Sequence, residues 1–237
     1  MSHKWLVIRL EAPLMAFGGV AVDQENPTRD FPSASMLTGL AANAFGWHWS
    51  DRAAHQALQD RLIFAARRER EPIASGIVID VQNVQLGKGD KGWTTFGTPE
   101  GRDGASYGAP HRRTRRYLAD QAVRVVLRFD PAEIDPTLDE LAAALDRPAR
   151  PLFIGRKSCL PACTLTDGWV DGDTAHGALC ALSGSGTFRA LWPVGEGPET
   201  GDSVERVVDL PDVRNWRTGL HAGSRAVVEG HVKGADS

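Results

Sequence analysis

A long glycine-rich segment, residues 85–118, restricts most strongly how this chain can fold. It holds seven glycines, seven Lys or Arg against three Asp or Glu, and the aromatic residues Trp93, Phe96, Tyr107 and Tyr117. Such a long irregular segment is uncommon inside a compact domain unless it is functional or disordered. The fold must therefore allow two consecutive strands to carry a long insertion, which we expect to be a flexible cationic arm.

The remaining composition is typical of a globular protein. The chain has 237 residues, of which 42% are hydrophobic and 24% charged, and its formal net charge is -3. This length can form one large domain or two small ones around a buried core. Residues 1–130 carry 17 basic and 14 acidic side chains, whereas the remainder carries 10 and 16. The basic character is therefore local, which argues against a protein that coats nucleic acid without selectivity.

The three cysteines indicate reduced thiols. An odd number of cysteines without a signal-peptide pattern favours a cytoplasmic location, and the apolar runs are too short to cross a membrane. Cys159 and Cys163 are four residues apart, but no second Cys or His pair follows at a zinc-finger spacing. The sequence also lacks a P-loop and a dinucleotide fingerprint. We therefore expect no metal and no cofactor.

Strand-like and helix-like segments alternate along the first part of the chain. Apolar residues alternate along Lys4–Glu11, which indicates a strand, and Thr137 with Glu140 forms a capping box that opens a helix. The predicted strands are residues 4–11, 62–68, 77–86 and 122–129. The predicted helices run from Ser33 or Ser35 to Gly46, from Ser50 to about Leu62, and from Thr137 to about Leu145.

This order predicts an α+β fold with two parts. Residues 1–150 are compatible with a ferredoxin-like or RRM-like (RNA-recognition-motif-like) domain that carries a thumb insertion at about residues 85–118. Residues 151–237 are expected to form a smaller β-rich C-terminal lobe, because short apolar pieces there are separated by Gly, Pro and Asp. Those pieces are residues 178–182, 187–192, 204–210 and 225–232.

The arginine cluster at residues 111–116 points to a polyanionic partner. Its four arginines repel one another unless phosphates lie near, and guanidinium groups bind phosphate oxygens through paired hydrogen bonds. Trp93 and Tyr107 can then stack on unpaired bases, although Trp93 can equally pack against protein. A solvated loop with scattered charges is the alternative interpretation. RNA is the partner that we expect.

Four segments, in their order and spacing, resemble one known family. They are KWLVIRLEAPLMAFGG at residues 4–19, TRDFPSASMLTGLAANAFG at 28–46, RRYLADQAVRVVLRF at 115–129 and RPARPLFIGRKSCLP at 147–161. Asn215-Trp216-Arg217 and the glycine- and valine-rich tail are similar more loosely. Over nearly its whole length the chain resembles the CasD subunits of type I-E CRISPR Cascade complexes.

The resemblance implies a non-catalytic, architectural role in antiviral defence. Proteins of this family have an RRM-like domain, a thumb and a smaller C-terminal sheet, and they hold the 5′ handle of the crRNA. They cap the filament of CasC backbone subunits near the large subunit CasA, through which the complex reads target DNA. The expected partners are therefore the crRNA handle, CasC and CasA, and indirectly target DNA.

The resemblance also implies where RNA is bound. The turn at residues 13–19 and the helix start at residues 32–35 would line the handle and offer backbone N–H groups to phosphate. Many relatives have Trp where this chain has Phe17, and often a basic residue where it has Ser33-Ala34. Arg29 is the expected substitute for the missing cation.

The loop Gly155-Arg156-Lys157-Ser158 matches a further family pattern, glycine-arginine-basic-serine. It fits an RNA contact and a structural turn with solvated cations equally well. The residues expected to bind RNA are Phe17, Gly18, Arg29, Ser33, Ser35, Lys88, Lys91, Trp93, Tyr107, His111, Arg112, Arg113, Arg115, Arg116, Arg156 and Lys157.

A metal-independent endoribonuclease is the alternative function. In a related CRISPR subtype the equivalent subunit cuts precursor RNA, with Tyr, Lys and His transferring protons around the attacking 2′-hydroxyl. Comparable side chains in or beside the arm are Tyr107, Tyr117, His111, Lys88 and Lys91. In type I-E systems, however, a separate subunit, CasE, does the cutting. We therefore expect no enzyme activity.

Overall fold

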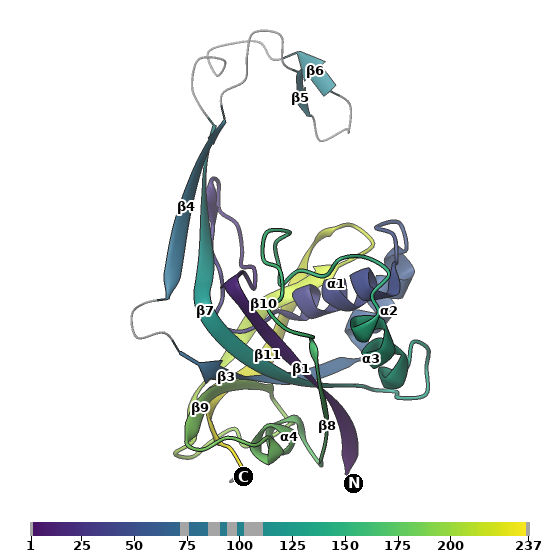
Figure 1. The fold of residues 1–237 in the computed structure, drawn as a ribbon, viewed down its shortest axis with the longest axis vertical. Helices are drawn as coiled ribbons and strands as arrows, with labels where there is room; N and C mark the ends of the chain where they lie inside the picture. The colour runs from purple at the N-terminus through teal and green to yellow at the C-terminus, as the bar shows by residue number, and fades with distance from the viewer. Residues whose placement is uncertain (1, 72–75, 85–90, 94–98, 102–110, 236–237) are drawn as a thin grey trace.

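One large, mainly antiparallel sheet organises the computed structural model of this chain (Figure 1). Seven strands follow in the order β10–β11–β9–β3–β7–β1–β8, and β2 and β4 also pair with β7. The strands are β1 (His3–Met15), β2 (Glu25–Asn26), β3 (Leu62–Arg70), β4 (Ile77–Val84), β7 (His111–Phe129), β8 (Thr166–Gly172), β9 (Thr187–Pro193), β10 (Val204–Asn215) and β11 (Leu220–Lys233). The structure describes residues 2–71, 76–84, 91–93, 99–101 and 111–235.

Helices cover both faces of this sheet. Side chains of α1 (Ala34–Phe45), α2 (Arg52–Asp60) and α3 (Leu138–Asp146) share one apolar core, and those of α4 (Ala175–Ala181) share a second. β1 contributes side chains to both cores, because Leu6, Ile8 and Leu10 belong to the first and Trp5 and Val7 to the second. None of these five side chains is more than 2% exposed. A strand segment that is buried on both faces must be apolar on both, which explains the continuous apolar run of residues 5–8 in β1.

Two predicted helix starts are confirmed, because their signals are local. The Ser33 hydroxyl accepts a hydrogen bond from the Met36 N–H, and Gly46 ends α1 with a φ of 77°. Thr137 and Glu140 form the predicted capping box at the start of α3.

The start of α2 differs from the prediction. Asp51, not Ser50, precedes the first helical residue, and no side-chain cap bond is formed there. The Asp51 carboxylate instead accepts the His48 N–H at 2.7 Å, and the Ser50 hydroxyl contacts Nδ1 of His48 at 2.9 Å. These side chains therefore stabilise the preceding turn, whose geometry displaces Ser50 from the cap position.

Residues 178–182, one of the short apolar pieces of the expected β-rich lobe, lie largely within α4. Thr174 caps this helix by accepting the Gly177 N–H, and the Glu196 carboxylate accepts the Ala175 N–H at 2.8 Å. A short apolar run fits a strand and a buried helix equally well. The contact with Glu196, distant in the sequence, favours the helix.

The strand β7 begins eleven residues before the predicted strand at Ala122, so residues 111–118 are not part of an irregular arm. They pair with β4 along one edge and with β2 along the other. We call β4 and residues 111–118 the ribbon, which projects from the sheet in Figure 1. Between its strands in sequence, β5 (Lys91–Trp93) and β6 (Pro99–Gly101) form a separate two-stranded sheet.

A polar cluster fixes the base of the ribbon. Asp120 has a positive φ of 50°, and the pairing of β3 with β7 shifts register between Arg68 and Arg70. The Arg70 guanidinium donates to the Asp120 carboxylate at 2.9 Å and to the Glu11 carboxylate at 3.1 Å. β7 thus changes course where these three side chains meet.

The expected division at residue 150 falls between α3 and β8. Strands from both sides of it share one sheet, since β8 pairs with β1 and β9 pairs with β3. The division into two domains stays a prediction.

Candidate nucleic-acid interface

A cleft with a volume of about 570 Å³ lies beside α1. Its walls come from the turn after β1, α1, the segment around α2, the loop before β8 and the tip of the β10–β11 hairpin. Its charged and large aromatic lining residues are Arg52, Arg150, Arg156, Arg214, Phe17, Trp47, Trp49, Phe153 and Trp216. Among the described residues that line it, none is Asp or Glu. Positive charge beside planar surfaces suits a single-stranded nucleic acid.

Five of the residues expected to bind RNA line this cleft: Phe17, Gly18, Ser33, Ser35 and Arg156. The Phe17 ring is fully buried, and its N–H donates to the Thr28 hydroxyl at 3.0 Å. Neither the ring nor the N–H of Phe17 is therefore free to meet RNA. Gly18 is exposed and has a φ of 79°, so the backbone of the turn is accessible from the cleft at this residue.

The start of α1 already holds a carboxylate. Asp212, on β10, is 3% exposed and accepts the Ala34 N–H at 3.1 Å. It also pairs with the Arg225 guanidinium at 2.9 Å. Because a helix start attracts negative charge through its free N–H groups, Asp212 occupies part of the site that we expected for phosphate. Ser33 and Ser35 border the cleft, but the Asp212 carboxylate already accepts one of the free N–H groups at the start of α1.

Arg156 connects the cleft to the base of the ribbon. Its guanidinium donates to the backbone carbonyls of Arg116 at 2.9 Å and Asn26 at 3.2 Å, and it lies over the Tyr117 ring at 4.6 Å. These contacts support a structural role for the loop, while Arg156 still lines the cleft. Lys157, the next residue, is exposed.

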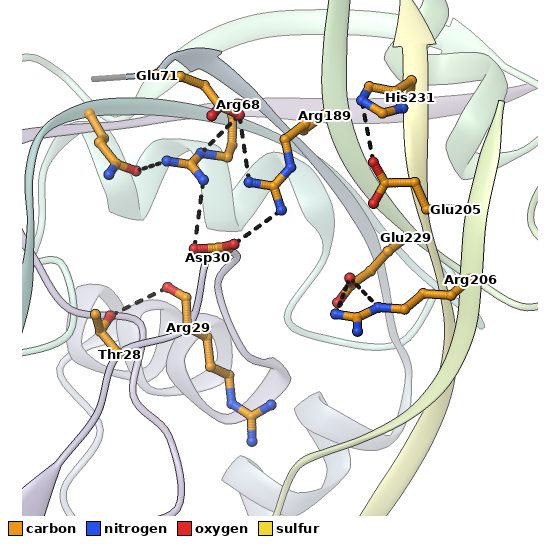
Figure 2. A network of polar contacts seen from close by, with 11 residues as sticks. Thr28, Arg29, Asp30, Arg68, Glu71, Arg189, Glu205, Arg206, Glu229 and His231 are labelled. Atoms are coloured by element: carbon orange, nitrogen blue, oxygen red, sulfur yellow. Dashed lines mark hydrogen bonds and ion pairs between the residues drawn. The ribbon is translucent and has the colours of Figure 1, made fainter. Parts of the chain in front are cut away.

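Arg29 lies in a different hollow, of about 440 Å³. Its guanidinium donates to the Pro211 carbonyl at 2.9 Å. The hollow is also lined by Asp30, Asp209 and Glu229, so it favours an anion far less than the cleft does. Figure 2 shows Asp30 held between two arginines and Glu229 paired with a third. Arg29 therefore does not replace the missing cation in the cleft.

The four arginines of the ribbon divide between its two faces. Side chains alternate along a strand, so Arg113 and Arg115 share one face, and Arg112 and Arg116 the other. Arg113 donates to the Asp23 carbonyl at 2.8 Å, and Arg112 to the Asn83 side chain at 3.3 Å. Arg112, Arg113 and Arg116 are exposed, and Arg115 is half-buried. Both faces of the ribbon are therefore cationic.

Five other expected RNA contacts cannot be placed in the site. Lys88 and Tyr107 lie outside the described residues. Lys91 and Trp93 belong to β5 and His111 begins β7, but the structure describes only their backbones.

Sequence reasoning missed most of the cleft's cations and rings. Trp47 and Trp49 flank His48 directly after α1, and Arg52 follows on α2. The Arg52 guanidinium lies 5.3 Å from the centre of the Trp49 ring, which is 70% exposed. An exposed tryptophan so close to an arginine in sequence was a usable signal. Arg150 and Arg214 had no comparable sequence signal, because only the fold brings them to the cleft.

The tip of the β10–β11 hairpin, residues 214–219, rests against α2. The Arg52 guanidinium donates to the Arg217 carbonyl at 2.8 Å, and the rings of His55 and Trp216 lie 4.7 Å apart. The Arg214 guanidinium lies 4.9 Å from the centre of the Trp216 ring. The hairpin tip thus brings a cation and a planar ring into the cleft together.

The pair His176 and Cys180 on α4 is not an activated nucleophile. Cys180 Sγ lies 3.8 Å from His176 Nδ1. Burial raises the pKa of the Cys180 thiol and lowers the pKa of His176, which favours the neutral form of both groups. The thiolate is the reactive form of cysteine, so the thiol is not activated here. The His176 ring packs edge-on against Trp192, and Cys180 packs against the second core.

Among the described residues, no three or more His, Cys, Asp or Glu side chains are grouped to hold a metal ion. In the same part of the chain, no helix has the length and apolar character needed to cross a membrane.

Comparison with known proteins identifies the family. Residues 5–228 match the family model described as CRISPR-associated protein (Cas_Cas5). The chain belongs to the Cas5 family. This Cas5 chain is also 28% identical over 157 residues to the CRISPR system Cascade subunit CasD of Escherichia coli (strain K12). That match covers 66% of this chain and 67% of CasD, and it confirms the resemblance inferred from sequence.

Solved structures share the fold of this Cas5 chain. A chain of a CRISPR RNA-guided surveillance complex matches with a TM-score of 0.64 and 21% identity, covering 97% of this chain and 91% of that one. A crystal structure of a Cas protein matches with a TM-score of 0.58 and 21% identity, covering 97% and 95%. The mixed α/β architecture around a large antiparallel sheet is therefore shared.

Proposed function

We propose that this protein is a non-catalytic subunit of a type I-E Cascade complex that holds the 5′ handle of the crRNA. The observation that carries this proposal is the cleft, whose described lining has four arginines, three tryptophans and no carboxylate. RNA handles are single-stranded polyanions, so they need cations for phosphates and rings for unstacked bases. Membership in the Cas5 family and similarity to the Cascade subunit CasD support the same role.

The strand order supports a ferredoxin-like organisation for the N-terminal part. Four strands, which occur along the chain in the order β1, β3, β7, β8, lie side by side in the sheet as β8–β1–β7–β3. Each neighbouring pair is antiparallel. α1 and α2 connect β1 to β3, and α3 connects β7 to β8. For these four strands and three helices, the order matches a βαββαβ arrangement with one extra helix, which supports the proposal. The ribbon then corresponds to the predicted thumb, and the strands β9–β11 to the C-terminal lobe.

CasC and CasA are the protein partners that we propose. The handle would pass from the cleft to the ribbon by way of Arg156, which contacts both. The ribbon would reach the adjoining CasC subunit, and the complex would work in the cytoplasm. Target DNA would be met only through the assembled complex.

The cleft arginines provide the test. Arg52→Ala and Arg214→Ala each remove one cation, and we expect each to weaken binding of handle RNA about tenfold, as for the removal of a charged hydrogen bond. The slope of log affinity against log salt should fall by about 0.7 for each phosphate that is no longer bound. Affinity is measured by filter binding of the full chain to labelled handle RNA over a salt series.

Arg206→Ala is the matched control. This arginine lies in the second hollow and is paired with Glu229 at 2.7 Å, so its loss should leave RNA affinity unchanged. Equal affinity for the wild type and both cleft variants at every salt concentration would refute the assignment of the handle to the cleft.

A further inference from the structure

The side chain of Gln59, at the end of α2, mimics a neighbouring strand. Its Nε2 donates to the Arg214 carbonyl at 2.8 Å, and its Oε1 accepts the Arg214 N–H at 3.2 Å. The same oxygen accepts the Trp216 indole N–H at 3.0 Å. Gln59 is only 6% exposed, so these bonds form away from water. A primary amide suits this position because it both donates and accepts.

These bonds lie on the outer edge of the sheet, because β10 is the last strand in the order β10–β11–β9–β3–β7–β1–β8. The pairing of β10 with β11 shifts register between Leu210 and Val213 and again between Val213 and Arg214. Arg214 is matched with His221 of β11 directly after the second shift, just where the hairpin tip begins. Gln59 supplies a partner for both its N–H and its carbonyl, which fixes the path of the chain there.

Neighbouring contacts orient the Trp216 ring. The Gln56 side-chain oxygen accepts the Trp216 N–H at 3.0 Å. The His55 ring lies 4.7 Å from that of Trp216, with 32° between their planes. The ring is therefore held through its indole N–H, its backbone and one neighbouring ring. Gln59 is the one residue among these that bonds to both Arg214 and Trp216.

We infer that Gln59 is a positioning residue that holds Arg214 and Trp216 ready to bind RNA in the cleft. This inference rests on the proposed function. Without Gln59 the hairpin tip loses the partner that sets its path, and the cation and the ring lose their shared position. Binding would then have to order both side chains, so RNA affinity falls although neither RNA-binding residue is changed.

A double-mutant cycle tests the inference. Gln59→Leu keeps a similar size but removes all three hydrogen bonds. We expect it to weaken binding of handle RNA about tenfold in the wild-type background. In the Arg214→Ala, Trp216→Ala background the same change should weaken binding less than about threefold, because the residues through which Gln59 acts are absent. Affinities are measured by filter binding with the full chain.

Arg115→Ala, on the ribbon, supplies the matched control background. The three hydrogen bonds of the Gln59 side chain reach only Arg214 and Trp216, so the effects of Gln59→Leu and Arg115→Ala should multiply. Gln59→Met also removes all three hydrogen bonds while it keeps the length of the side chain, so it should weaken RNA binding as Gln59→Leu does. This variant provides the same comparison if Gln59→Leu folds poorly.

The outcomes separate this inference from the proposed function. If Gln59→Leu weakens binding equally in the wild type and without Arg214 and Trp216, Gln59 acts through general stability and the inference is wrong. If Arg52→Ala and Arg214→Ala both leave affinity unchanged, the cleft does not bind the handle, and the inference falls with it.

Discussion

Gly155 is a residue whose lack of a side chain holds two walls of the cleft together. Its φ is 89°, and a Cβ atom at this position would overlap the backbone carbonyl oxygen of Ala16. The Ala16 N–H donates to the carbonyl of Ile154 at 3.2 Å, so the loop and the turn after β1 are in direct backbone contact. Any side chain at position 155 must separate them.

Replacement of Gly155 by Ala should therefore lower the free energy of unfolding by more than the cost of the positive φ alone. Gly168 has a similar φ of 95° with no atom within 4 Å of the place a Cβ would take, so Gly168→Ala is the matched control. The positive φ should cost both variants about 1–2 kcal/mol. Overlap with Ala16 should cost Gly155→Ala about 1–3 kcal/mol more. Urea unfolding measures both, and equal losses of stability would contradict the close approach.

Among the elements, the ribbon is where sequence and structure differ most. Glycines and arginines at residues 85–118 indicate an irregular arm, yet residues 111–118 form a strand because β4 and β2 supply partners on both edges. Pairing with distant residues decides this, and local composition carries no trace of it. The starts of α1 and α3 were predictable for the opposite reason, since each cap lies within three residues of the N–H that it accepts.

Removing the arginines from the ribbon tests its role as an element. We expect the fourfold Ala variant of Arg112, Arg113, Arg115 and Arg116 to assemble less on crRNA and to show a flatter salt dependence. The slope should fall by about 0.7 for each phosphate that the ribbon no longer binds. Co-purification with the other Cascade subunits and a repeat-spacer RNA, over a salt series, measures both effects.

A fourfold Lys variant is the control for charge. It keeps four positive charges but not the paired hydrogen bonds of guanidinium, so it should retain the salt slope and bind less tightly. An Ala variant that assembles as well as the wild type at every salt concentration would show that the ribbon does not bind RNA.

The whole molecule is expected to bind RNA without cutting it. Of the side chains considered for proton transfer, Tyr117 is 5% exposed and its ring lies under the Arg156 guanidinium. Labelled repeat RNA incubated with the purified protein in EDTA should therefore remain intact. A discrete product that disappears in the His111→Ala variant would instead establish endoribonuclease activity.

The sequence by itself determined the elements with local signals, the cationic character of the ribbon, and the family. Only the tertiary structure decided the cleft, because its walls come from residues 16–18, 33–43, 47–55, 150–156 and 214–219. It also buried Phe17 and placed Asp212 at the start of α1, where we had expected phosphate. Caps and strand alternation act over a few residues, whereas burial and charge pairing depend on which distant segments meet.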